Sequence, residues 1–382
     1  MATAPDRIVT AKHLVDRASV LKVRQGDKTW PAKIAGLDAD HDLCWLAVEG
    51  LEAPAVRSRP SFTVRLGERV YAVESSKGSE LVMHQGLVTG LPEYQLARLI
   101  QIDATAFKGF SGGGLFDGGG RMLGIITAIA IEGQQVYLVL PGEWVPSREV
   151  RPASDAPATP ASHSRFQALA WFELGYRAWE ARDDAKAIAS YQKAIQLRSD
   201  VSDVWFYLGL ACERSQKKQQ AISAYKEAAR LRPDYSEGWL RLGAAQMDSD
   251  QHEEAAKAFE RAVGLKPSHA LAWYNLGGAY SQLKQYERAV KAYELAVRLQ
   301  PDYAFAWRAL ALAYVQLRQY DQAVRSYQQV LRLKPQDAEI WYALGNVYRI
   351  QGDQAKVMEV YERLKTLSPE LANKFLREVV RQ

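Results

Sequence analysis

The second half of the chain repeats a helical pattern of apolar and polar positions every 34 residues. Tryptophan recurs at positions 171, 205, 239, 273, 307 and 341, with leucine three positions later and an aromatic residue twenty positions later in every copy. Proline closes five of the six copies. Apolar residues spaced three and four apart are typical of amphipathic helices, and proline cannot continue a helix. Each copy is therefore predicted to form two antiparallel helices.

Small residues mark where the two helices of each copy approach closely. Glycine follows four positions after the tryptophan in five copies, with Ala311 in the other, and alanine follows sixteen positions after it in five copies, with Val357 in the other. One copy cannot bury its own apolar face, so neighbouring copies are expected to stack into a superhelix. The predicted repeats are 168–201, 202–235, 236–269, 270–303, 304–337 and 338–371, with a capping helix over 371–381.

Residues 1–145 lack this periodicity and contain short β-type runs separated by Gly, Asp, Pro and Ser. Predicted strands lie near 19–23, 33–36, 44–48, 69–73, 86–90, 97–102, 122–127 and 135–140. Many short strands with turn signals between them indicate a sandwich or barrel. Residues 146–163 are rich in Pro, Ala and Ser, which predicts a semi-extended linker. The predicted domains are thus 1–145 and 164–382.

Bulk composition narrows the class of protein. The chain has 382 residues, of which 48% are hydrophobic and 24% charged, values typical of a globular protein with more than one domain. No run of eighteen apolar residues occurs, so no membrane-spanning helix is expected. The net charge of +5 is spread along helices where bases alternate with acids, which does not predict nucleic-acid binding. Cys44 and Cys212 lie in different predicted domains, so no disulfide is expected.

Three segments of the first half carry the side chains of an acyl-transfer site. In chain order they hold His13, Asp42 and Ser111. A serine nucleophile needs a base, the base needs an orienting carboxylate, and the developing oxyanion needs backbone N–H donors. The glycines around Ser111 allow the tight turn that aims such donors at one point. No Cys, His, Asp or Glu cluster has metal-ligand spacing, so no metal or cofactor is expected.

The segment Gly109–Gly113 also fits the G-x-S-x-G elbow of α/β-hydrolases. That fold places its histidine after the serine, and its elbow joins a strand to a helix. The histidines after Ser111 are His163, His252 and His269, which lie in the predicted linker and repeats. The segment after Ser111 is glycine-rich and then β-like, so this interpretation is rejected.

The first half resembles the trypsin-fold peptidases of the Deg/HtrA type over roughly residues 5–145. The family motifs T-x-x-H-V, D-L-A-V-L and D-A-A-I-N-x-G-N-S-G-G are matched at residues 10–15, 42–46 and 103–113. The resemblance implies a trypsin-like double β-barrel followed by the helical repeats. It implies that Ser111 is the nucleophile, His13 the general base and Asp42 its orienting partner. The N–H groups of Gly109 and Ser111 would form the oxyanion hole.

The same resemblance implies a substrate pocket, and the chain departs from the family pattern at its N-terminal end. Its wall would be formed by Ala106, Thr127, Ala128 and Ile129, where the lack of an acid favours an apolar P1 side chain of modest size. Only about seven residues precede Ile8, so the first barrel is expected to be incomplete. The first residues have no apolar run, so they are not expected to form a signal peptide; the resemblance would imply the periplasm or cell envelope if an upstream signal were lost.

The 34-residue repeat resembles the tetratricopeptide (TPR) family, whose arrays bind extended peptides or helices in a concave groove. Carried over, the groove would be lined by Phe206, Leu210, Leu240, Tyr274, Phe305, Arg308, Tyr342, Asn346 and Arg349. Phe172 and Tyr176 occupy the positions of the carboxylate clamp of chaperone-binding members, so binding of chaperone tails is not predicted. An array that serves only self-association is the alternative.

Together these patterns predict a serine endopeptidase whose TPR array recruits protein or peptide substrates or partner proteins. Two alternatives stay open at this point. One is a non-catalytic TPR scaffold that carries an incomplete protease-like domain. The other is a repeat adaptor whose first domain only binds peptides by strand addition.

Overall fold

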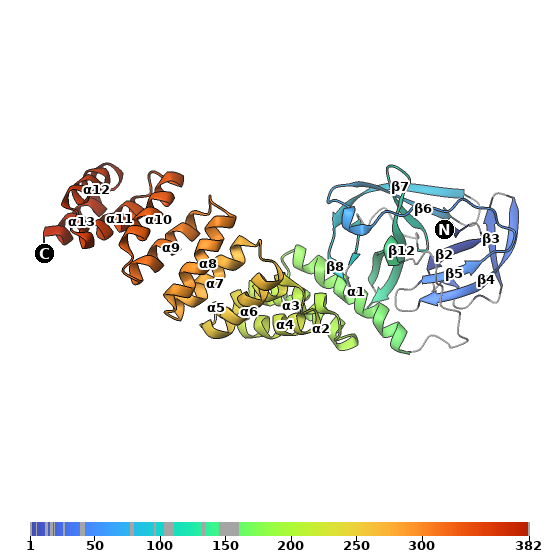
Figure 1. Cartoon of the computed structure of the whole chain (residues 1–382). Helices are drawn as coiled ribbons and strands as arrows, with labels where there is room; N and C mark the ends of the chain where they lie inside the picture. Colours follow the sequence, from blue (N-terminus) through green and yellow to red (C-terminus); the bar gives the residue numbers. More distant parts are fainter. Residues whose placement is uncertain are drawn as a thin grey trace. The chain divides into compact units, whose positions relative to one another are not determined.

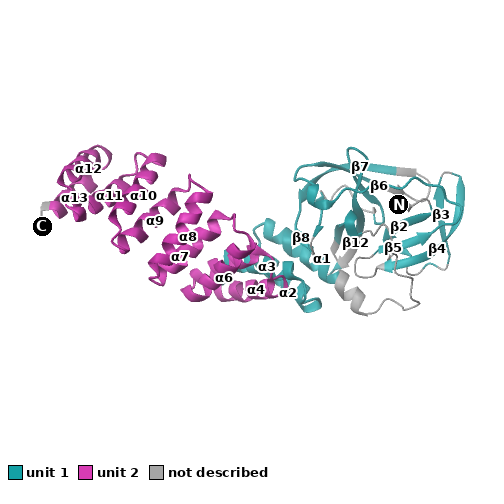
Figure 2. Ribbon diagram, viewed as in Figure 1, with its two compact units in different colours: residues 1–217 teal, residues 218–382 magenta. Residues whose placement is uncertain are grey.

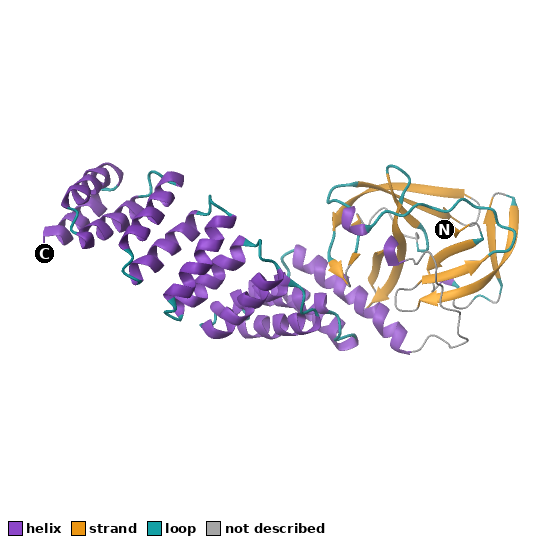
Figure 3. Ribbon diagram, in the orientation of Figure 1, coloured by secondary structure: helices purple, strands orange, loops and turns teal. Residues whose placement is uncertain are grey.

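β-Strands occupy the chain up to Pro141, and α-helices occupy it from Pro160 onward (Figure 3). The computed structural model (Figure 1) describes residues 2–4, 6–11, 14–15, 18, 20–25, 27–38, 43–76, 80–94, 97–102, 111–131, 134–144 and 160–380. No helix in these ranges is both long and apolar enough to cross a bilayer.

The first sheet contains five antiparallel strands in the order β1-β2-β5-β4-β3. The strands are β1 (Ala2–Ala4), β2 (Arg7–Ala11), β3 (Leu21–Gln25), β4 (Lys28–Asp38) and β5 (Leu43–Ala47). The long strand β4 pairs with β3 through its first half and with β5 through its second half. Val15, Cys44, Leu46, Val48 and Leu51 form the buried core of this half-barrel.

The second sheet has the order β10-β7-β6-β11-β12-β13. Its strands are β6 (Arg69–Ser76), β7 (Glu80–Gly90), β10 (Gln101–Ile102), β11 (Gly114–Asp117), β12 (Met122–Ile131) and β13 (Gln134–Pro141), and a short ribbon of β8 (Glu93–Tyr94) and β9 (Ala97–Arg98) lies beside them. Its core holds Val70, Val88, Leu115, Ile126 and Val139, among other residues. This sheet forms a near-closed barrel.

One predicted strand is wrong in its extent. The run 97–102 is divided into β9 and β10. Leu99 donates its backbone N–H to Pro92 O at 3.0 Å instead of continuing the ladder, and the adjacent side chains of Leu99 and Ile100 are both buried. The predicted strands did not include β2 or β11, which are short runs of five and four residues that contain polar side chains.

Thirteen α-helices follow within the described part of the chain. They are α1 (Pro160–Glu180), α2 (Asp184–Leu197), α3 (Ser202–Arg214), α4 (Lys218–Leu231), α5 (Ser236–Met247), α6 (His252–Leu265), α7 (Ala270–Gln282), α8 (Tyr286–Leu299), α9 (Ala304–Gln316), α10 (Tyr320–Leu333), α11 (Ala338–Gln351), α12 (Gln354–Leu367) and α13 (Pro369–Val380). Helix α1 begins at Pro160, so residues 160–163, which the sequence assigned to the linker, are helical. Proline is favoured in the first turn of a helix, which explains this start.

The conserved spacing within the repeats has a direct structural cause. A Cβ added to Gly243 or Gly277 would lie 2.6 Å from the ring of Phe259 or Tyr293, respectively, so glycine lets the second helix of these two repeats approach this closely. Each tryptophan from 239 onward donates its indole N–H to a proline carbonyl six residues earlier, for example Trp307 to Pro301 O at 2.9 Å. Tryptophan and proline therefore recur together.

The chain divides into two compact units, residues 1–217 and 218–382 (Figure 2). The first unit contains both β-sheets together with α1, α2 and α3. The second contains α4 to α13, and α13 packs on α11 and α12 at its end. The domain bounds derived from the sequence remain a prediction.

Candidate active site

Ser111 starts a tight turn that two backbone hydrogen bonds attach to β12. Gly112 N–H donates to Ile126 O at 2.7 Å, and Ile126 N–H donates to Gly113 O at 2.9 Å. Gly112 has a φ of +82°. A Cβ at this position would lie 2.4 Å from Leu14 Cδ1 and 2.8 Å from Thr10 Oγ1. The turn is thus pressed against the end of β2, in a conformation that glycine adopts without strain.

The hydroxyl of Ser111 is buried in this turn. Its Oγ has no hydrogen-bond partner among the residues that the structure describes. A buried hydroxyl that stays unpaired costs roughly 1–3 kcal/mol. A partner outside the described residues is therefore expected, and its identity belongs to the proposal below.

His13 and Asp42 lie outside the described residues, but the strands that carry them are described. Strand β2 ends at Ala11, two positions before His13, and β5 begins at Leu43, one position after Asp42. Ala11 and Leu43 are directly paired in the antiparallel register. The two strand ends that lead to the predicted base and its predicted carboxylate partner are therefore neighbours.

The remaining predicted peptidase positions are only partly described. Gly109 and Ala106 lie outside the described residues. Thr127 is fully buried on β12, opposite Leu138 of β13. Ala128 and Ile129 continue β12 opposite Tyr137 and Val136.

The turn between β11 and β12, which follows the serine turn, is held by a buried carboxylate. Asp117 accepts hydrogen bonds from the backbone N–H groups of Gly119 and Arg121 at 2.9 Å and from Arg121 Nε at 2.8 Å, and it pairs with Arg59 at 3.2 Å. Burial alone would raise the pKa of Asp117, but these donors lower it below its usual range. The carboxylate therefore stays ionised and fixes one end of the strand pair that carries Ser111.

The predicted groove residues differ widely in exposure. In the first unit Phe206 is buried and Leu210 is half-buried. In the second unit Leu240 is buried, whereas Phe305 is 60% exposed and Arg308 is also exposed. Buried side chains cannot contact a partner without rearrangement, and Phe305 and Arg308 are the two predicted groove residues that are exposed.

Helix α13 covers the C-terminal members of the predicted groove. Tyr342 donates its hydroxyl hydrogen bond to the Glu378 carboxylate at 2.8 Å, and Arg349 Nη1 donates to Glu378 O at 3.1 Å. The Tyr342 and Phe375 rings lie 5.8 Å apart. Asn346, between them on α11, is half-buried. This end of the array is therefore occupied by the chain itself.

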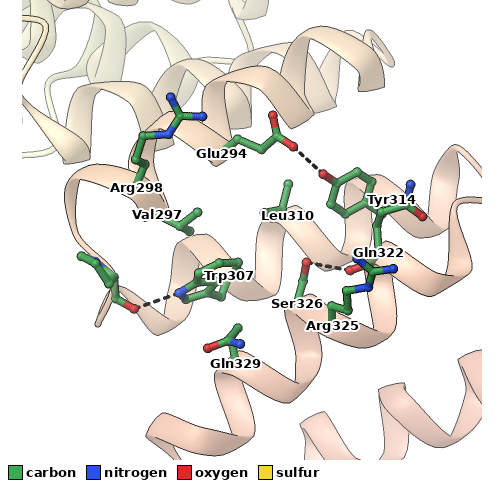
Figure 4. Close-up of a pocket in the computed structure, with 11 residues that line it drawn as sticks. Glu294, Val297, Arg298, Trp307, Leu310, Tyr314, Gln322, Arg325, Ser326 and Gln329 are labelled. Atoms are coloured by element: carbon green, nitrogen blue, oxygen red, sulfur yellow. Dashed lines mark hydrogen bonds between the residues drawn. The ribbon is translucent and has the colours of Figure 1, made fainter.

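Sequence reasoning missed a pocket of about 660 Å³ between α8, α9 and α10 (Figure 4). Val297, Trp307 and Leu310 supply its apolar lining, while Arg298 and Arg325 add basic groups. The sequence feature that could have indicated this pocket is the residue 22 positions after each tryptophan. Arginine stands there in two other repeats of this unit, where Arg261 lies 5.7 Å from the Trp239 ring and Arg363 lies 5.9 Å from the Trp341 ring. The corresponding residue at the pocket is Gln329.

The described residues include no group of three or more His, Cys, Asp or Glu side chains able to hold a metal ion. The site contains the buried hydroxyl of Ser111 in a glycine-rich turn. This turn lies against the end of β2, which pairs with the start of β5. This arrangement can serve acyl transfer if the neighbouring base and carboxylate face the hydroxyl.

Comparison with known proteins separates the two halves of the chain. Residues 2–125 match the model of the trypsin-like peptidase domain. Over this part the chain is similar to Protease Do-like 1, chloroplastic, of Arabidopsis thaliana, with 34% identity over 136 residues, covering 32% of this chain and 30% of that protein. It is also similar to the periplasmic serine endoprotease DegP of Escherichia coli (strain K12), with 30% identity over 152 residues, covering 38% of this chain and 31% of that protein. The chain thus spans less than a third of the length of these relatives.

The second half matches repeat models. Residues 172–236 and 240–304 match a tetratricopeptide repeat model, residues 338–371 match another, and residues 313–352 match a model described as TPR repeat. The solved structure of MamA protein is similar, with a TM-score of 0.43 and 24% identity, covering 45% of this chain and 94% of that chain. The predicted fold class, a trypsin-like double barrel with an incomplete first barrel followed by TPR helices, is confirmed. The chain carries an N-terminal trypsin-like peptidase domain with DegP-like homologues, followed by tetratricopeptide repeats.

Proposed function

We propose that the N-terminal domain is a serine endopeptidase with Ser111 as nucleophile, His13 as general base and Asp42 as its orienting carboxylate. One observation carries the proposal. Gly112, the neighbour of Ser111, packs against Thr10 and Leu14, which lie on either side of His13 in the chain. The strand before His13 also pairs with the strand after Asp42. Each of the three candidate catalytic residues is therefore within three positions, along the chain, of a residue in one of these two contacts.

In this mechanism Ser111 Oγ attacks the carbonyl carbon of the scissile peptide bond while His13 accepts its proton. Asp42 holds the imidazole in the required tautomer and stabilises the imidazolium that forms. The N–H groups of Gly109 and Ser111 stabilise the tetrahedral oxyanion, and one such donor is worth about 3 kcal/mol of barrier. His13 then protonates the leaving amine, and water hydrolyses the acyl-enzyme by the same proton transfers.

The substrate pocket is proposed to lie beside β12, with Ala106, Thr127, Ala128 and Ile129 in its wall. The buried position of Thr127 on β12 is consistent with a wall of small and apolar side chains. Such a wall carries no charge to pair with Lys or Arg. The domain is therefore expected to prefer an apolar P1 side chain of modest size.

The array is proposed to recruit an extended protein segment through the accessible part of its groove. In the second unit Tyr274 is half-buried, and Phe305 and Arg308 are exposed. An exposed aromatic ring beside a cation suits a segment with apolar and acidic side chains. At the C-terminal end of the groove, Tyr342 and Arg349 donate hydrogen bonds to Glu378 of α13, so the proposal assigns the first contacts to Phe305 and Arg308.

Labelling by a fluorophosphonate probe tests the peptidase proposal, because the probe reacts only with an activated serine. The intact chain should be labelled, the Ser111→Ala variant should not, and the intact chain alone should cleave an unfolded protein substrate. Equal labelling of both proteins, or none of either, would contradict the proposal. That result would favour the non-catalytic TPR scaffold.

A further inference from the structure

Helix α1 packs directly on the second β-sheet. It contacts both β12 and β13 within the first compact unit (Figures 1 and 2). Aromatic rings fill the contact, since the centroid of Phe172 on α1 lies 5.0 Å from that of Tyr94 on β8 and 5.9 Å from that of Tyr191 on α2. The first repeat and the barrel therefore share one packed core.

A buried carboxylate lies at the centre of this contact. Glu173 is 1% exposed, and its Oε1 accepts hydrogen bonds from Gln101 Nε2 at 2.9 Å and from Arg177 Nε at 2.8 Å. Arg177 Nη2 also donates to Tyr137 O on β13 at 3.0 Å. Among the described residues, Glu173 Oε2 has no partner. Burying a carboxylate costs free energy unless it is paired. The presence of Glu173 here therefore indicates that its hydrogen bonds are needed to hold α1 on the barrel.

The repeat pattern indicates that Glu173 and Arg177 are not required for folding of a TPR helix pair. The position six after the tryptophan is small and buried in the five later repeats, where it holds Ala211, Ala245, Ala279, Ala313 and Val347. In the first repeat it holds Arg177. The position two after the tryptophan holds Glu only in the first repeat, at Glu173. Both departures occur where α1 meets the barrel.

Strand β12 connects this contact with the serine turn. Gln101 anchors α1 from β10, and its side chain covers Gly90, where an added Cβ would lie 1.9 Å from Gln101 Oε1. Strand β12, on which α1 packs, exchanges two hydrogen bonds with the serine turn through Ile126. Movement of α1 would thus reach the turn along β12.

We propose that Glu173 is a positioning residue for Ser111, acting by holding α1 on Gln101 and β12, and that α1 is a structural support of the peptidase site. The inference rests on the proposed peptidase function. The first TPR helix is then part of the catalytic domain.

The test compares fluorophosphonate labelling of the full chain with that of Glu173→Ala, Glu173→Gln and Gln246→Ala. Gln246 is a matched control, because it is a buried polar residue on α5, in the second unit. Glu173→Ala should lower the labelling rate constant on the order of tenfold, since small misplacement of reacting groups is costly. Glu173→Gln should restore most of the rate, because its amide oxygen can still accept from Gln101. A lower end-point with an unchanged rate constant would mean only loss of folded protein and would overturn the proposal.

Hydrogen exchange separates this inference from the peptidase proposal. In Glu173→Ala, the amides of Gly112 and Ile126 should exchange faster than in the parent chain, whether or not the chain is labelled. Unchanged exchange over residues 111–127 overturns the inference, whereas absence of labelling in the parent overturns only the peptidase function. If Glu173→Ala does not fold, Gln101→Met removes the same hydrogen bond at nearly constant volume and should give the same result.

Discussion

Gly112 is the single residue on which the geometry of the serine turn most depends. A methyl group there would meet Thr10 and Leu14 and would also force alanine to a φ of +82°. We expect Gly112→Ala to destabilise the chain by about 2–4 kcal/mol and to abolish labelling of Ser111. Gly120→Ala is the matched control, because Gly120 also has a positive φ, of +74°, but has nothing within 4 Å of its Cβ position. Urea unfolding should show a loss of only about 1 kcal/mol for the control; equal losses would contradict the steric argument.

Glu173 makes a second residue-scale prediction, on pH. Burial raises the pKa of its carboxyl, although Arg177 and Gln101 lower it in part. The folded state therefore binds a proton that the unfolded chain releases near its ordinary pKa of about 4.3, so this group makes stability fall as pH rises above that value. Glu173→Gln lacks the titration. Between pH 4 and pH 7, the urea unfolding midpoint of Glu173→Gln should rise relative to that of the parent chain as pH rises. A difference between the two midpoints that does not change with pH would contradict the burial argument.

At the scale of elements, the turn between the two helices of each repeat stores strain. Arg182, Gln216, Asp250, Lys284 and Arg318 have φ values of 58° to 63°, and Gly352 takes the same place in the last repeat. Left-handed backbone costs a side-chain-bearing residue roughly 1–2 kcal/mol, and part of this is offset because glycine loses more entropy on folding. Lys284→Gly and Arg318→Gly should each stabilise the second unit by about 0.5–1 kcal/mol in thermal unfolding. Lys291→Gly, in the middle of α8, is the control and should destabilise it by about 1 kcal/mol.

The pocket beside Trp307 gives another element-scale prediction. In two other repeats an arginine lies over the corresponding tryptophan, and Gln329 replaces it here. Gln329→Arg should place a guanidinium over Trp307 and add about 0.5–1 kcal/mol of stability. Gln329→Met, which fills space without a charge, is the comparison. Equal thermal midpoints for the two variants would show that volume and not the cation is responsible.

How much of these elements could be predicted depends on how local the signal is. The 34-residue period predicted the repeat helices because the signal is local: Gly175, Gly243 and Gly277 each contact the aromatic residue of their own helix pair. The break between β9 and β10 could not be predicted, because Leu99 and Ile100 look like strand residues and the hydrogen bond from Leu99 N–H to Pro92 O leaves no sequence pattern. The three candidate catalytic residues came from motifs in one order. The pairing of Ala11 with Leu43, beside two of them, is encoded by no local pattern.

At the scale of the whole molecule, the predicted domain bounds stay a prediction, and the contacts of α1 add an attachment to the sheets that the sequence did not indicate. The contact between Gln101 and Glu173 joins residues 72 positions apart, and one amide and one carboxylate leave no periodic signal in a sequence. The only trace was the departure of Glu173 and Arg177 from the repeat pattern. Composition of the segment before α1 predicted separation, whereas the buried side chains of α1 show attachment within the first unit.

This attachment can be tested by cutting the chain. A specific protease site inserted between Ser154 and Asp155 would divide the sheets from the helices. Because α1 packs on β12 and β13 and Phe172 lies against Tyr94, we expect the two fragments to co-elute in size-exclusion chromatography after cleavage. Phe172→Ala combined with Glu173→Ala removes the apolar and the polar part of the contact and should let them separate, whereas Gln246→Ala should not. Separation of the fragments without these substitutions would show that α1 is held to the sheets by the covalent chain alone, and the role of Glu173 in positioning Ser111 would fail with it.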